Sequence, residues 1–199
     1  MQSGRRRPGT EELGTLARLF NQGLIVEAET LSKSLTTRFP KHGFGWKVLG
    51  AVYQAQQRYA DSLHATRHAI ALLPNDAATY NNLGTSFLCL ERIDEAEANF
   101  KKALAIAPDY AKALSNLGNL LKKQGKLHQA ETCCRRALEI EPRYANAHVN
   151  LGNTLLMQDR LSEAQTCYRA ALTITPAAAN IHSNLLYCLS HDVTIEPQQ

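Results

Sequence analysis

The sequence predicts an all-α fold, an α-solenoid in which antiparallel helix pairs stack into a right-handed superhelix. The stretch 77–108, AATYNNLGTSFLCLERIDEAEANFKKALAIAP, recurs at an offset of 34 residues as 111–142 and again as 145–176. In each copy, apolar residues recur at three- and four-residue spacing in two blocks, which is the pattern of two amphipathic helices. A proline closes each second block, where it ends the helix because it lacks an N–H donor and clashes with the preceding turn. These prolines are Pro74, Pro108, Pro142 and Pro176.

Each repeat is therefore expected to contain a first helix, a tight turn and a second helix. The first helices are predicted at 43–56, 77–90, 111–124 and 145–158, and the second helices at 59–72, 93–106, 127–140 and 161–174.

Small residues predict how the two helices of a pair pack. A glycine in the middle of each first helix costs about 1 kcal/mol relative to alanine, a cost explained by a second helix that crosses closely at that point. Pairs that cannot bury a core alone must then stack on their neighbours. The glycines are Gly50, Gly84, Gly118 and Gly152, and the small residues expected to face them are Ser62, Ala96, Ala130 and Ala164, then Ala69, Ala103, Ala137 and Ala171.

The repeats predict one array over 9–191, with atypical units at both ends. The copy at 9–42 is degenerate, because Leu16 and Leu35 replace small packing residues, as expected of a terminal repeat. Residues 179–191 match a first helix only, with Leu186 in place of the glycine. Residues 1–8 are predicted to be a disordered lead-in and 192–199 a linker. The full repeats are predicted at 43–76, 77–110, 111–144 and 145–178.

Composition narrows the possible partners. The formal net charge is +4, and Arg5, Arg6 and Arg7 supply most of it; without them 19 Lys and Arg remain against 18 Asp and Glu. A nucleic-acid binder normally carries a strong basic patch, so no nucleic-acid partner is expected. No apolar run approaches the roughly 18 residues that span a bilayer, and no apolar segment follows the basic N-terminus as in a secretory signal. We therefore expect a cytoplasmic protein without a membrane partner.

The five cysteines predict free thiols in a reducing compartment, since their number is odd and none has zinc-ligand spacing. Cys133 and Cys134 are adjacent on a predicted helix. A vicinal redox pair is conceivable, but buried or half-buried thiols are the favoured interpretation.

The repeated residues resemble the tetratricopeptide repeat (TPR), with Trp/Tyr, Leu-Gly, Tyr/Phe, Ala, Phe/Tyr, Ala and Pro in phase over about residues 9–191. More narrowly, the Asn-Leu-Gly triplets and the ending Ser183-Asn-Leu-Leu are similar to the TPR region of O-linked N-acetylglucosamine transferases of the SPINDLY type. That resemblance implies a protein-interaction region whose asparagine ladder binds substrate backbones. It also implies a glycosyltransferase domain beyond Gln199.

One asparagine position predicts a peptide-binding row along the concave groove, which the first helices of such a superhelix are expected to line. The amide of asparagine offers two donors and an acceptor, so it can bind both polar groups of a peptide unit. Equivalent helices of neighbouring repeats lie about 10 Å apart, roughly three residues of extended chain at about 3.3 Å each. The row would suit an extended segment of about ten residues. Its members are Asn82, Asn116, Asn150 and Asn184, with a second row of Thr85, Asn119 and Asn153 one turn further on.

Two alternatives for these positions remain open. The asparagines could instead bond between helices or simply face water. A clamp for a chaperone's C-terminal carboxylate is the other alternative, with Lys47, Asn82 and Lys112 on matching positions. Two of its five elements are missing, since Ala51 and Asn116 stand where the clamp needs an asparagine and a basic residue. Lys112, with Lys122 and Lys123, would still favour acidic segments.

No catalytic, metal or cofactor site is predicted. His64 and His68 are four residues apart on a second helix, but no carboxylate or cysteine is placed to complete a metal site. No Ser/His/Asp arrangement or phosphate-binding loop occurs. The leading hypothesis is a domain that binds extended protein segments for a glycosyltransferase; the second is a stand-alone TPR scaffold or chaperone-tail adaptor. A homo-oligomer is possible through the ends of the array.

Overall fold

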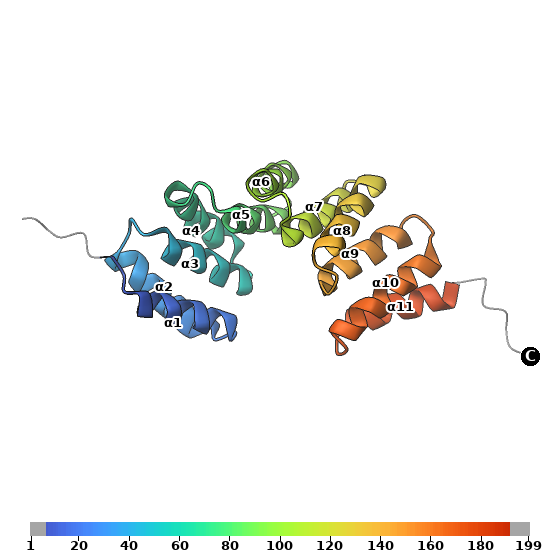
Figure 1. Cartoon of the computed structure of the whole chain (residues 1–199), viewed down its shortest axis with the longest axis horizontal. Coiled ribbons are helices and arrows are strands. Elements are labelled where there is room, and N and C mark those ends of the chain that lie inside the picture. The colour runs from blue at the N-terminus through green and yellow to red at the C-terminus, as the bar shows by residue number, and fades with distance from the viewer. Residues whose placement is uncertain (1–6, 192–199) are drawn as a thin grey trace, which may run out of the picture. The chain divides into compact units, whose positions relative to one another are not determined.

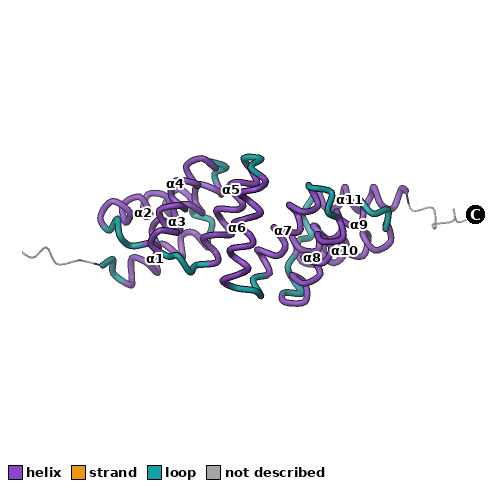
Figure 2. The backbone as a smooth tube through the Cα atoms, turned by 90° about the horizontal axis from the view of Figure 1, so that it is seen from above, coloured by secondary structure: helices purple, strands orange, loops and turns teal. Residues whose placement is uncertain are grey.

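A computed structural model describes residues 7–191, and every regular element in that range is an α-helix, which confirms the all-α prediction (Figures 1 and 2). The chain divides into two compact units, Met1–Ile106 and Ala107–Gln199. Residues 1–6 of the predicted lead-in and the predicted linker lie outside the described residues. The first unit contains α1 (Thr10–Asn21), α2 (Ile25–Arg38), α3 (Gly43–Ala55), α4 (Tyr59–Leu72), α5 (Ala77–Cys89) and α6 (Ile93–Ile106); the second contains α7 (Ala111–Lys123), α8 (Leu127–Ile140), α9 (Ala145–Leu156), α10 (Leu161–Ile174) and α11 (Ala179–His191).

The predicted helix positions are confirmed. All four second helices have the predicted bounds, and the first helices start at the predicted residues but end one or two residues early. The reason is a left-handed residue in the turn of every repeat, whose positive φ cannot continue a right-handed helix. It is glycine in two repeats but not in the other three. These residues are Gly23 (φ 74°), Gln57 (60°), Glu91 (58°), Gly125 (75°) and Asp159 (57°).

The close crossing of the helices is also present at the expected small residues, since Ser62 Oγ donates to the carbonyl oxygen of Gly50 at 2.9 Å, but a larger side chain takes part as well. A Cβ added to Gly84 would lie 2.7 Å from Cε1 of Phe100, and one added to Gly152 would lie 2.8 Å from Cε1 of Tyr168. The small residues are fully buried, and a Cβ added to Gly84 would also lie 3.2 Å from the carbonyl oxygen of Ala96. Small residues let the backbones of the two helices approach. A larger side chain, one turn after the small residue on the second helix, then covers the glycine. The covering residues are Thr66, Phe100, Cys134 and Tyr168.

Each unit buries its own apolar cluster. In the first unit the two leucines of the degenerate repeat, Leu16 and Leu35, join Val48 and Val52. In the second unit Tyr168 is fully buried among residues of α8, α9, α10 and α11. Leu186, in place of the glycine of α11, is 65% exposed. The stacking of consecutive pairs therefore supplies a core that a single pair lacks.

The crossing predicts opposite effects for two glycine substitutions. Gly152→Ala should lower the free energy of unfolding by about 1–3 kcal/mol, because the new methyl group overlaps the buried ring of Tyr168. Gly14→Ala is the matched control, since no atom lies within 4 Å of the added Cβ and alanine favours a helix by about 1 kcal/mol. Urea denaturation of the two variants checks both signs. Stabilisation by Gly152→Ala would contradict the close crossing.

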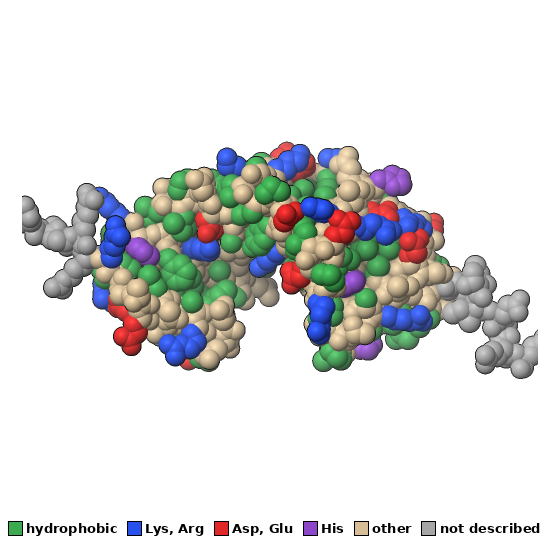
Figure 3. All heavy atoms as spheres, viewed as in Figure 1, with side chains coloured by type: hydrophobic (Ala, Val, Ile, Leu, Met, Phe, Trp, Pro, Cys, Tyr) green, Lys and Arg blue, Asp and Glu red, His purple; other side chains and the backbone are tan. Residues whose placement is uncertain are grey.

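An arginine at the start of a second helix connects consecutive repeats in each unit. Arg160 Nη1 lies 2.8 Å from Glu131 on α8, and Arg160 Nη2 lies 2.7 Å from Glu163. Arg58 repeats this arrangement in the first unit, 3.1 Å from Glu29 and 2.6 Å from Asp61. Side chains of both signs are interspersed on the face of each unit seen in Figure 3.

The two glutamates that these arginines reach in the preceding repeat, Glu29 and Glu131, have strongly depressed pKa values. Hydrogen bonds from Lys33 and then Gln56 lower the pKa of Glu29 to about 2. Burial raises the pKa of Glu131, but hydrogen bonds from Arg135 and Arg160 outweigh it and lower the value to about 2. A carboxyl group with a depressed folded-state pKa stabilises the fold fully above its unfolded value of 4.5, and this contribution is lost as the pH falls toward 2.

The fold should therefore lose stability between about pH 4.5 and pH 2. Glu131→Gln should lower the free energy of unfolding at pH 7 by about 1 kcal/mol, and the acid dependence should become shallower because one of the most strongly depressed carboxyl groups is gone. Chemical denaturation at a series of pH values measures both. An unchanged acid dependence of the unfolding free energy in Glu131→Gln would show that this carboxylate does not contribute to it.

Candidate functional site

The first predicted asparagine row lies partly within the second unit, on three first helices. Asn116 of α7, Asn150 of α9 and Asn184 of α11 are all half-buried at equivalent positions. Nδ2 of Asn150 donates to the backbone oxygen of Ser115 at 3.2 Å and to its Oγ at 2.9 Å. This amide therefore joins α9 to α7, and its orientation is fixed by the protein.

The second row makes similar contacts at Asn153. Oδ1 of Asn153 accepts from Nδ2 of Asn184 at 3.1 Å and from the hydroxyl of Tyr168 at 2.8 Å. Asn119 is half-buried at the equivalent place on α7. Asn150, Asn153 and Asn184 thus make the bonds between helices that the sequence left open as an alternative. Asn150 and Asn184 use only Nδ2 in these bonds, so their Oδ1 atoms are separate acceptors.

The remaining members of the rows, Asn82 and Thr85, lie half-buried on α5 of the first unit. Thr85 Oγ1 donates within its own helix to the carbonyl of Asn81 at 3.0 Å. The backbone oxygen of Asn82 accepts from Nε2 of Gln54, which also donates to Ser86 Oγ at 2.7 Å. Sequence reasoning missed Gln54, because its position holds Leu88, Lys122 and Leu156 in the later repeats.

The lysines of the proposed clamp have different surroundings. Lys112 is exposed in the first turn of α7. Nζ of Lys47 lies 2.7 Å from Oδ2 of Asp76, whose other oxygen accepts from the backbone N and Oγ1 of Thr79, each at 2.7 Å. Burial raises the pKa of Asp76, but the bonds from Lys47 and Thr79 outweigh it and hold the pKa below its usual range. A clamp would have to take Lys47 from this carboxylate.

A further contact recurs at the fourth position of the first helices. The ring nitrogens of Trp46, His148 and His182 lie 3.0, 2.9 and 2.8 Å from the carbonyl oxygen of the proline six residues earlier. Each bond fixes the loop that enters the helix. Sequence reasoning missed this contact, although the recurrence of a ring N–H donor six residues after a proline is a usable signal.

The histidine pair contacts aromatic rings, and the cysteines are free thiols. His64 and His68 are exposed, with ring centroids 4.7 Å apart, and His68 stacks on Trp46 at 4.5 Å. Between residues 7 and 191, no group of three or more His, Cys, Asp or Glu could hold a metal ion. All five cysteines are free. Cys134 is buried and Cys133 half-buried, which confirms that interpretation, and burial raises the pKa of Cys134 to about 12.

Comparison with known families decides what kind of array this is. The family model for the tetratricopeptide repeat matches residues 46–109 and 109–177, which is more than half of the chain. The chain belongs to the tetratricopeptide repeat family. In the part of this TPR chain that the structure describes, no helix has the length and apolar character needed to cross a membrane.

Solved structures share the TPR fold. A thermophilic TPR protein of Thermus thermophilus, TTC0263, is similar with a TM-score of 0.78 and 20% identity, over 90% of this chain and 98% of that chain. PilW, a type IV pilus biogenesis factor, is similar with a TM-score of 0.77 and 24% identity, over 91% of this chain and 86% of that chain. YrrB, a TPR protein with an unusual peptide-binding site, is similar with a TM-score of 0.64 and 18% identity, over 92% of each chain. No curated protein matches the sequence.

Proposed function

We propose that this TPR chain binds extended polypeptide segments through its first helices. The observation that carries the proposal is the anchored amide of Asn150, half-buried on α9 and held by Ser115 of α7. Its Nδ2 contacts the protein, which leaves Oδ1 as an acceptor for a backbone N–H of a peptide. Asn184 repeats the arrangement through Asn153.

Anchoring favours binding because an oriented side chain loses little conformational freedom when the ligand arrives. Equivalent amides one repeat apart would contact an extended chain about every third residue. Backbone contacts of this kind select for extended shape rather than for one sequence. The exposed Lys112 on α7 adds a preference for acidic segments.

The comparisons support this proposal at the level of the family. The TPR family model covers the helices that carry Asn82, Asn116 and Asn150. YrrB, with a similar fold, is described by its peptide-binding site. The scaffold function is thus the one that the family and the side chains favour together.

Two variants of one hydrogen bond test the proposal. Asn150→Ala should weaken the binding of fluorescein-labelled decamers, selected from a random peptide library on the immobilised chain, by about three- to tenfold, because it removes the acceptor. Ser115→Ala is the matched control: it removes the Oγ partner but keeps the amide and its bond to the backbone oxygen. Both variants should cost about 1 kcal/mol or less of stability.

Fluorescence anisotropy gives the affinities, and thermal melts give the stabilities. Equal loss of affinity in both variants would mean that Asn150 acts only through the packing of α9 on α7. Unchanged affinity in Asn150→Ala would show that the asparagine row does not contribute to peptide binding.

A narrower proposal is that the chain recruits substrates for an O-GlcNAc-transferase-like glycosyltransferase. Its support is the Asn-Leu-Gly triplets and the Ser183-Asn-Leu-Leu ending; a stand-alone scaffold fits the TPR comparisons equally well. In either case the chain itself binds and does not catalyse. A cytoplasmic location belongs to the same proposal, because all five thiols are free. The coding sequence after Gln199 tests the narrower proposal, since an immediate stop codon contradicts it.

A further inference from the structure

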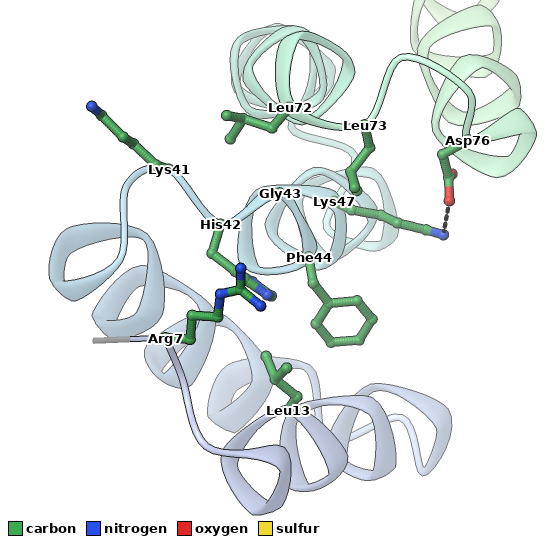
Figure 4. A pocket seen from close by; sticks show the side chains of 10 residues that line it. All are labelled: Arg7, Leu13, Lys41, His42, Gly43, Phe44, Lys47, Leu72, Leu73 and Asp76. Carbon is green, nitrogen blue, oxygen red and sulfur yellow. Dashed lines mark hydrogen bonds and ion pairs between the residues drawn. The ribbon is translucent and has the colours of Figure 1, made fainter. Parts of the chain in front are cut away.

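A pocket of about 630 Å³ opens in the first unit between α1, the start of α3 and the end of α4 (Figure 4). Its volume lies within the range of about 300–1,000 Å³ that is usual for ligand sites. The side chains that line it form two groups, one apolar and one basic. The apolar group is Leu13, Phe44, Leu72 and Leu73, and the basic group is Arg7, Lys41, His42 and Lys47, with Asp76 beside Lys47.

The apolar wall is built by the packing of the terminal repeats. Leu13 and Phe44 are half-buried at the edge of the first unit's core. Leu73 closes over α3 because Gly43 has no side chain there: a Cβ at Gly43 would lie 2.5 Å from Cγ of Leu73. The wall therefore offers an apolar surface to an aliphatic or aromatic side chain.

The charges of the pocket are not balanced. Asp76 is already bonded to Lys47 and Thr79. Within residues 7–191, no carboxylate pairs with Arg7 or with Lys41, and both are exposed. Figure 4 shows the side chain of Arg7 running toward His42, whereas Lys41 extends outward from the loop before α3. An anion at this place would meet a guanidinium that has no carboxylate partner among the described residues.

We propose that this pocket recognises an acidic side chain next to an apolar one in an extended peptide. The carboxylate of Asp or Glu binds Arg7, whose planar fork suits a carboxylate, and Lys41 adds attraction at the rim. A Leu, Ile or Phe within two residues of that acid enters the apolar wall. This inference rests on the proposed function and adds a sequence preference to it.

The test compares two pairs of substitutions in one peptide selection. Arg7→Gln with Lys41→Gln removes the free charges. Arg18→Gln with Lys102→Gln is the matched control, because it removes two exposed cations elsewhere in the same unit. Decamers enriched on the unmodified chain should pair an acid with an apolar residue. Their affinity should fall about five- to tenfold in the first double variant, stay unchanged in the second, and decrease with added salt.

Two altered peptides separate the parts of the proposal. Replacing the acid by its amide, or the apolar residue by serine, should weaken binding of the peptide to the unmodified chain. The amide peptide should bind the Arg7→Gln/Lys41→Gln variant about as well as its parent peptide does, because the charges that recognise the acid are already gone. Peptides that bind through Asn150 yet ignore both substitutions at Arg7 and Lys41 would overturn the pocket and leave the proposed function standing. No enrichment of any peptide would overturn both.

Discussion

The close crossing of two helices at a glycine is the constraint on which the rest of each unit depends. A glycine in mid-helix is unfavourable by itself, so its repeated presence requires a gain elsewhere. That gain is the approach of the second helix, which places Phe100 over Gly84, Cys134 over Gly118 and Tyr168 over Gly152. Burial of these side chains against the glycine supplies the apolar surface that each pair contributes to its unit.

The same crossing determines where polar groups can lie. With the glycine turned toward its partner helix, the asparagine two residues earlier is half-buried on the first helix, as at Asn116 and Asn150. At that depth an amide can bond a neighbouring first helix and still meet a ligand. The bond from Asn150 to Ser115 shows the first of these roles. In the proposed function, structure and binding would use the same residue, and the two contributions separate only when each partner of the bond is changed in turn.

The fold was predictable because its determinants repeat every 34 residues. Helix bounds followed from periodic apolar residues and prolines, and the close crossing from glycine. The residue covering each glycine was not predictable, because Thr66 and Tyr168 share a position without sharing size or polarity. The bonds of Asn150 and Asn153 depend on side-chain conformations between repeats, which a pattern within one repeat does not contain. The pocket beside Arg7 escaped prediction for another reason: it lies where the repeat is degenerate and the lead-in joins it.

In the proposed function the first helices present the binding surface while the second helices support it. Amide hydrogen exchange of the second unit, with and without a bound decamer from the library, tests it most directly. Slower exchange is expected in α7, α9 and α11, with little change in the exposed faces of α8 and α10. Protection confined to α8 and α10 would contradict the account, because it would place the ligand on the helices assigned to support.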